Sequence, residues 1–175
     1  IDLSGVSSAK SAALPIESGI LSKPQALTVK LPEASITFDK ATLSGLADKA
    51  LEEGAATEEI RVAAEKVAVS SLSEAQQAAV GNAAVYDLSL FISEKRISKF
   101  SVTATVSIPY TLKTGERPEG ITVWYLNDED VLEEMTSVYD AATGTVTFTT
   151  THFSYYLVGY DGSGLWTNPF VDVAY

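Results

Sequence analysis

The sequence contains no cysteine, and this absence removes two classes of structure. Without thiols the chain can form neither a disulfide framework nor a thiolate metal site. Exported proteins without cysteine are typical of bacterial surfaces rather than of animal secretions. There is also a single histidine, His152. Any catalytic arrangement of a histidine with a serine must therefore be local to that residue.

Positive charge is scarce. Lysine and arginine number 12 against 23 acidic residues, which gives a net charge of −11. Nucleic acids and anionic membrane surfaces both require clustered positive charge, so neither is an expected partner. No apolar run approaches the roughly 20 residues that cross a bilayer, and no membrane insertion is predicted. Because the chain begins without methionine or a signal segment, we interpret it as a processed or excised piece of a larger exported protein.

The first half of the chain has mixed character. Residues 1–25 are rich in Ser, Ala, Gly and Pro and predict one weak strand followed by a loop. Alternating apolar residues over 26–31 and 35–38 predict two short strands. Apolar residues then recur at helical spacing over 43–51, which predicts a helix. Asp39 is its predicted N-cap residue, and Gly54 is placed where a helix ends.

Two further elements complete this half. Residues 60–69 alternate β-branched and polar side chains, and they predict a strand. Ser73 followed three residues later by Gln76 has the form of a capping box and predicts a short helix that ends before Gly81.

From residue 83 the pattern is almost continuously that of β-strands. Predicted turns at 114–120 and 127–130, and a hairpin at 140–144, separate strands at 85–92, 97–110, 121–126, 131–139, 145–150 and 153–160. We therefore predict an α+β, mainly β protein: an antiparallel β-sandwich with two short helices in its N-terminal half. The expected organisation is an α+β half over 1–82, a sandwich half over 83–160 and a linker over 161–175. The two halves are also compatible with one continuous domain, because neither helix can build a core alone.

Two stretches resemble a known family. The motifs between Val102 and Tyr160 are similar to a module of Gram-positive surface proteins that lies before S-layer homology repeats. Residues 168–173, Asn-Pro-Phe-Val-Asp-Val, resemble the opening of such a repeat, with its Phe-x-Asp-Val pattern. This resemblance implies an extracellular spacer associated with the cell wall or S-layer. It also implies that cell-wall polysaccharide is bound through a downstream anchor.

The tripeptide His152-Phe153-Ser154 resembles the cleavage site of self-cleaving β-sandwich modules, among them the GAIN domain. The resemblance implies that Ser154 Oγ attacks the Phe153 carbonyl while His152 takes or orients its proton. Serine is a weak nucleophile without such a base, and a planar amide resists attack unless the backbone is distorted. Residues 149–151 are predicted donors to the oxyanion. The alternative interpretation is a structural histidine at the start of a packed, aromatic-rich core strand.

Other candidate sites are weaker in sequence terms. Trp124, Tyr125 and Tyr139 suggest a sugar- or protein-binding surface, and the alternation of a strand places Trp124 on the face opposite to Tyr125. The acidic run at 128–130 with the acids at 133–134 does not match an EF-hand spacing, so a solvated hairpin is preferred to a calcium site. No cofactor, no metal and no enzyme acting on other molecules are predicted.

Overall fold

The structure is a computed structural model that describes residues 1–15, 26–52, 59–81 and 83–162. Gly54, the predicted end of the first helix, lies outside the described residues, as do residues 163–175 of the predicted linker and anchor.

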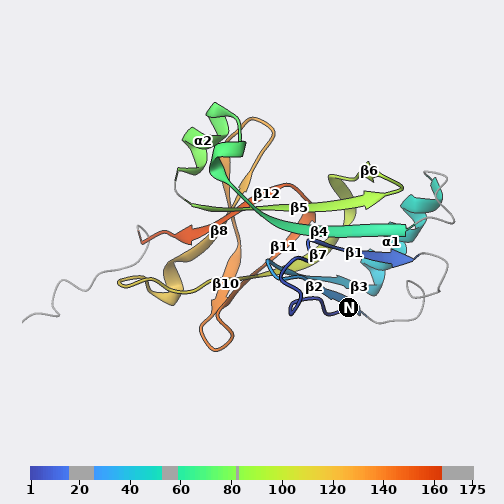
Figure 1. Cartoon of the computed structure of the whole chain (residues 1–175), viewed down its shortest axis with the longest axis horizontal. Coiled ribbons are helices and arrows are strands. Elements are labelled where there is room, and N and C mark those ends of the chain that lie inside the picture. The colour runs from blue at the N-terminus through green and yellow to red at the C-terminus, as the bar shows by residue number, and fades with distance from the viewer. Residues whose placement is uncertain (16–25, 53–58, 82, 163–175) are drawn as a thin grey trace, which may run out of the picture.

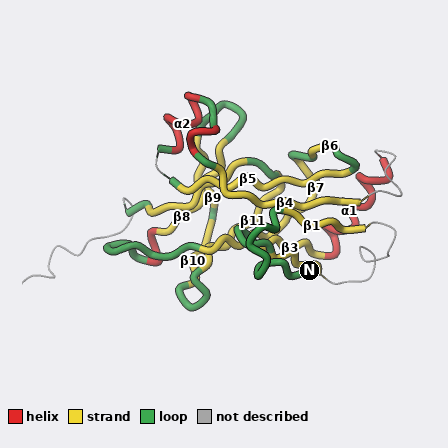
Figure 2. The backbone as a smooth tube through the Cα atoms, viewed as in Figure 1, coloured by secondary structure: helices red, strands yellow, loops and turns green. Residues whose placement is uncertain are grey.

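Two antiparallel sheets stack into a β-sandwich (Figures 1 and 2). The first sheet has the order β1 (Ser11–Pro15), β4 (Glu59–Val67), β5 (Ala84–Ile92), β12 (Tyr155–Tyr160), β8 (Ile121–Leu126) and β9 (Leu132–Met135), with the short β6 (Lys95–Arg96) paired to β5. The second has the order β10 (Ser137–Asp140), β11 (Thr145–His152), β7 (Lys99–Pro109), β3 (Ser35–Asp39) and β2 (Ala26–Lys30). The predicted fold class, mainly β with a sandwich and two α-helices, is confirmed.

Alternation along the strands builds the core. In β7 the predicted inward-facing residues Ala104, Val106 and Ile108 are fully buried, and the polar residues between them are not. Each inward face contributes to one hydrophobic cluster between the sheets. Burying one such aliphatic side chain stabilises the fold by about 1.5–3 kcal/mol, so the alternation largely fixes which face of each strand points inward.

Each sheet contains strands from both predicted segments of the chain, 1–82 and 83–160. In the first sheet β4 pairs with β5, and in the second β3 pairs with β7. The hydrophobic cluster between the sheets likewise runs from Ala12 to Val158. The segments 1–82 and 83–160 therefore share their sheets and their core.

The two α-helices occupy different positions. α1 (Lys40–Glu52) lies at one end of the sandwich (Figure 1), where Leu43, Leu46 and Ala50 are buried in the core. Its predicted N-cap is confirmed, because the Thr42 amide donates to Asp39 Oδ1 at 2.7 Å.

The second helix, α2 (Glu74–Val80), begins with the predicted capping box between Ser73 and Gln76. Val80 and the neighbouring Leu72 pack with Val85, Leu126 and Leu157 on the outer face of the first sheet. This helix therefore covers part of that face.

Three predicted boundaries were wrong. Residues 11–15 form β1 rather than a loop, because they pair with the edge of β4 despite their weak pattern. The predicted strand 131–139 is two strands, β9 and β10, which divide at Thr136 where the chain passes from one sheet to the other. The last predicted strand starts at Tyr155 rather than at residue 153, since Phe153 and Ser154 connect β11 to β12 and belong to neither strand.

Candidate functional site

The Phe153–Ser154 bond lies where the chain leaves the second sheet and enters the first. The register of β11 against β7 shifts between Thr150 and His152, just before this crossing. The Phe153 side chain is 1% exposed, with its ring centroid 6.4 Å from that of Phe38. Its amide donates to the Ser98 carbonyl at 2.8 Å, and the Ser154 carbonyl accepts from the Leu88 amide at 3.0 Å. Backbone hydrogen bonds therefore anchor the residue on each side of the Phe153–Ser154 bond.

The imidazole of His152 is fixed by two tyrosines. Its Nδ1 atom is 2.9 Å from the Tyr156 hydroxyl, and its ring centroid is 4.1 Å from that of Tyr125. The Tyr156 hydroxyl donates to the His152 carbonyl at 2.7 Å, as does the Thr150 hydroxyl at 2.9 Å. Because Tyr156 has one proton to donate, Nδ1 is best assigned as a donor to it. That tautomer leaves Nε2 as the ring's basic nitrogen.

This arrangement differs in part from the sequence-based hypothesis. Thr150 does supply a hydroxyl, but it donates to the carbonyl of His152, one residue before the bond that would be cleaved. Among the hydrogen bonds of the described residues, the imidazole is joined to Tyr156 and none joins it to Ser154. The structure thus brings His152 and Tyr156 together, a contact that the sequence did not suggest.

Burial sets the charge of this histidine. Desolvation lowers the pKa of His152; Glu133 and Asp128 act in the opposite direction, and Lys99 acts with the burial. Burial also raises the pKa of Tyr156, so its hydroxyl stays protonated. At neutral pH the imidazole is therefore neutral, the form that can accept a proton.

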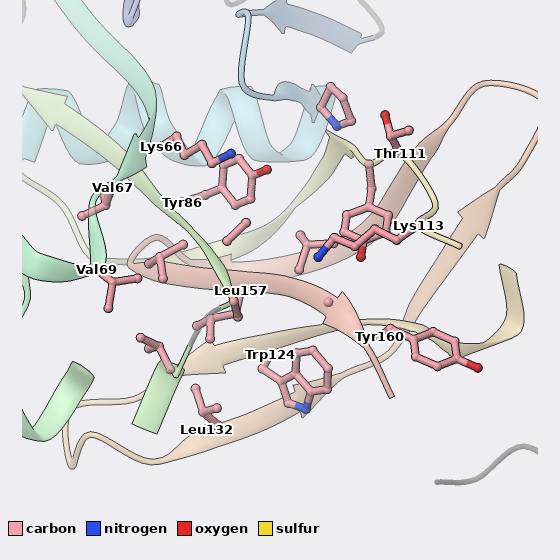
Figure 3. Close-up of a pocket in the computed structure, with 18 of the residues that line it drawn as sticks. Lys66, Val67, Val69, Tyr86, Thr111, Lys113, Trp124, Leu132, Leu157 and Tyr160 are labelled. Carbon is pink, nitrogen blue, oxygen red and sulfur yellow. The ribbon is translucent and has the colours of Figure 1, made fainter. Parts of the chain in front are cut away.

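A second site is a cleft of about 960 Å³ at the end of the first sheet, and Figure 3 shows the side chains that line it. It forms where β12 loses one neighbour. The pairing of β12 with β5 ends at Val158 and Ala84, whereas its pairing with β8 continues through Gly159 and Tyr160. Side chains from β4, β5, β8 and β12 surround this gap, together with Pro109 at the end of β7 and residues 110, 111, 113 and 116 after it.

The predicted aromatic set is divided between the two sites. Trp124 lines the cleft, whereas Tyr125 faces His152. Tyr139 lies against Tyr110, with ring centroids 6.3 Å apart and its hydroxyl donating to the Tyr110 carbonyl at 3.0 Å. The opposite orientation expected for Trp124 and Tyr125 is what the strand shows, and the three rings form no common platform.

The indole ring of Trp124 packs against Gly159. A Cβ atom placed on Gly159 would lie 3.2 Å from the indole Cζ3 atom, which is closer than side chains normally approach. The absence of a side chain at residue 159 therefore lets the indole lie over β12. Trp124 remains half-buried and borders the cleft.

The side chains of the cleft lining that are charged at neutral pH are two lysines and one carboxylate. Glu116 accepts hydrogen bonds from the Tyr110 hydroxyl at 3.0 Å and from the Lys113 amide at 2.9 Å. Burial, followed by this bond to Glu116, raises the pKa of Tyr110 to about 12. Lys66 and Lys113 are exposed at the rim, and within the described residues neither forms an ion pair.

The acidic hairpin after β8 has a structural explanation. Asn127 Oδ1 accepts from the amides of Glu129 and Val131, both at 2.9 Å, and its amide nitrogen donates to Glu133 at 2.7 Å. Asp128, Glu129 and Glu133 border a shallow hollow beside His152. Within the described ranges, no group of three or more His, Asp or Glu side chains is placed to hold a metal ion.

Neither the protein-family models nor the curated proteins contain a match to this chain. Of the helices in the described part of the chain, none is long and apolar enough to cross a bilayer.

Sequence reasoning missed most of the cleft. Lys66, Tyr86 and Lys113 come from three separate segments, and nothing in their local patterns marks them. Among the residues of the cleft, Gly159 is the one whose local sequence points to the cleft, because a glycine inside an apolar strand indicates that another group approaches the backbone closely.

Proposed function

We propose that this chain is a structural spacer of a bacterial cell-surface protein, preceding a wall-anchoring S-layer homology region. The observation that supports the proposal is the path of the chain. The N terminus lies in the half of the molecule nearer α1, whereas β12 ends at the opposite end (Figure 1). A tension applied along the chain is therefore transmitted through the length of the sandwich.

The strand that receives this tension is held on both sides. β12 pairs with β5 from Tyr155 to Val158 and with β8 from Tyr155 to Tyr160. A force directed along β12 loads these two ladders together, whereas a force on an edge strand breaks one ladder bond after another. At the other terminus, Leu3 and Lys30 are joined by a backbone hydrogen bond of 2.8 Å, on the edge strand β2.

The test is single-molecule unfolding under force, and the absence of native cysteine permits specific attachment. Ile1→Cys paired with Gly162→Cys pulls along the chain. Ile1→Cys paired with Val131→Cys pulls on the start of the edge strand β9 and is the matched control. We expect a higher unfolding force for the first pair. Equal forces, or a lower force for the first pair, would contradict the spacer proposal.

A second proposal, self-cleavage at Phe153–Ser154, is supported by the anchored crossing and by the neutral imidazole beside it. Ser154 Oγ would attack the Phe153 carbonyl carbon and lose its proton to His152 Nε2. The Phe153–Ser154 C–N bond would then break, with the proton passing to the Ser154 nitrogen. Water would hydrolyse the resulting ester to a Phe153 carboxylate and the Ser154 hydroxyl, which leaves residue 154 with a free N-terminal amine. β12 would keep its pairings to β5 and β8.

Intact mass under denaturing conditions tests this second proposal, on fresh protein and again after days at neutral pH. We expect two fragments that meet between residues 153 and 154, and a single chain for Ser154→Ala. Ser98→Ala, which keeps the carbonyl that binds Phe153, is the matched control and should cleave as the parent does. An unchanged single mass for the parent chain would leave His152 as a packed structural residue.

A further inference from the structure

We propose that the cleft beside Gly159 binds an acidic saccharide chain, with Trp124 as the stacking surface and the side chains of Lys66 and Lys113 as partners for its carboxylates. This inference goes beyond the spacer function and does not depend on self-cleavage.

The size and position of the cleft suit an extended ligand. Its volume of about 960 Å³ lies at the upper end of the range for ligand sites. It follows the unpaired side of β12 at Gly159 and Tyr160, so it is open along one direction rather than closed like a cavity. A chain of several sugar units can lie in such a cleft.

Trp124 supplies the surface on which a sugar ring packs. Because Gly159 has no side chain, the indole rests on β12 instead of standing away from it. Figure 3 shows Trp124 on one side of this strand, with Tyr86 and Lys113 on the other. A pyranose presents an apolar face of C–H groups to an aromatic ring and directs its hydroxyls outward, toward polar groups around the ring.

The hydroxyl of a largely buried tyrosine, Tyr86, is available to bond with those sugar hydroxyls. Tyr86 is 5% exposed, and it makes no hydrogen bond to another described residue. Its oxygen is not among the buried unsatisfied atoms, so it reaches the open space of the cleft. Burial raises its pKa, with a further contribution from Glu33, so the group remains a donor at neutral pH. The Tyr86 hydroxyl is therefore placed to donate to a ligand oxygen in the cleft.

The charge of the cleft selects an acidic ligand. The protein has a net charge of −11, yet the cleft borders two lysines that form no ion pair with another described residue, and one carboxylate, Glu116, that already accepts two hydrogen bonds. An acidic saccharide would be repelled by most of this surface and attracted here. Uronic acid units carry all three groups that these side chains can bind: an apolar C–H face for Trp124, hydroxyl groups for Tyr86, and a carboxylate for the two lysines.

The experiment measures binding of tetragalacturonate to the whole chain by calorimetry, at low and at moderate salt. Its fully methyl-esterified form is the matched neutral probe, and tetraglutamate tests for an acidic peptide instead. We expect saturable binding of tetragalacturonate that weakens with salt, at least about tenfold tighter than that of the ester.

Variants locate the binding. Lys66→Gln with Lys113→Gln should reduce the affinity for tetragalacturonate to that for the ester, whereas Lys40→Gln with Lys99→Gln, an equal change in net charge outside the cleft, should leave it within about twofold. Tyr86→Phe, which keeps the ring packed, should weaken binding of both saccharides by about fivefold.

Three results would overturn the proposal. The first is no saturable binding of tetragalacturonate. The second is an equal loss of affinity in the two lysine pairs, which would indicate a general effect of net charge. The third is tetraglutamate binding as tightly as the saccharide, which would assign the cleft to an acidic peptide. None of them bears on the unfolding forces or on the mass of the chain, so the spacer and self-cleavage proposals are tested separately.

Discussion

Replacing Tyr156 with phenylalanine removes one oxygen atom from the most heavily hydrogen-bonded side chain near the crossing between the sheets. Tyr156 is fully buried, and its hydroxyl lies within 2.9 Å of Thr150 Oγ1, the His152 carbonyl and His152 Nδ1. In the variant the carbonyl keeps its bond from Thr150, but Nδ1 loses its partner in a partly buried site. We expect the free energy of unfolding to fall by about 1–3 kcal/mol, the cost of leaving one polar group unsatisfied.

The matched control is Tyr155→Phe, the same chemical change one residue earlier. Tyr155 is half-buried on the outer face and makes no hydrogen bond to another described residue, so its loss should change stability by less than about 0.5 kcal/mol. Urea unfolding followed by fluorescence measures both variants. The reasoning is refuted if Tyr156→Phe is no more destabilising than Tyr155→Phe, since the hydroxyl would then contribute nothing.

A double-mutant cycle with Thr150→Val tests whether the two hydroxyls act together. They lie 2.7 Å apart, in a hydrogen bond in which either can be the donor, and each lies within 2.9 Å of the His152 carbonyl oxygen. The loss of unfolding free energy in the double variant should differ from the sum of the two single losses by a coupling energy of about 0.5–3 kcal/mol, of either sign. A sum that is additive within error would show that the two contacts are independent.

Three further predictions concern other parts of the fold. Because the pKa of His152 is lowered in the folded protein, the unfolded chain binds more protons than the folded chain once the pH falls below about 6.5. The free energy of unfolding should therefore decrease between pH 7.5 and 5. His152→Gln should flatten that dependence in urea melts. Ser73→Ala removes the capping box with Gln76 and should lower the unfolding free energy by about 1 kcal/mol, with Ser73→Asn as the conservative rescue. Gly120→Ala places a Cβ against the Tyr160 ring, closer than side-chain atoms can approach, and should cost about 1–3 kcal/mol, seen as a lower thermal midpoint. A midpoint equal to that of the parent would show that the Tyr160 ring moves freely aside.

Much of the fold could be predicted from local pattern. Alternation in β7 and β11, the capping box at Ser73 and the hairpin at 140–144 all depend on neighbours in sequence, and each is present in the structure. The division between β9 and β10 could not be predicted, because the pattern of a strand does not record which sheet it joins. Threonine is a residue type common in strands, and Thr136 interrupts the strand only because β9 and β10 join different sheets.

The candidate sites follow the same division. The alternation of β8 correctly separates Trp124 from Tyr125, since it needs no tertiary information. The contact between His152 and Tyr156 depends on the bend at 153–154, which removes these residues from a regular strand alternation. The cleft depends on where the pairing of β5 ends, a property of two strands that are about 70 residues apart in the chain.

The central position of β12 also affects how the protein is made. Of the described strands it is the last to be synthesised, yet it separates β5 from β8 within the sheet. Until residues 155–160 leave the ribosome, β5 and β8 each present an unpaired edge, and the first sheet exists only as two pieces. Open edges of this kind pair readily with other chains. Translation that stops before Tyr155 should therefore yield an aggregation-prone product.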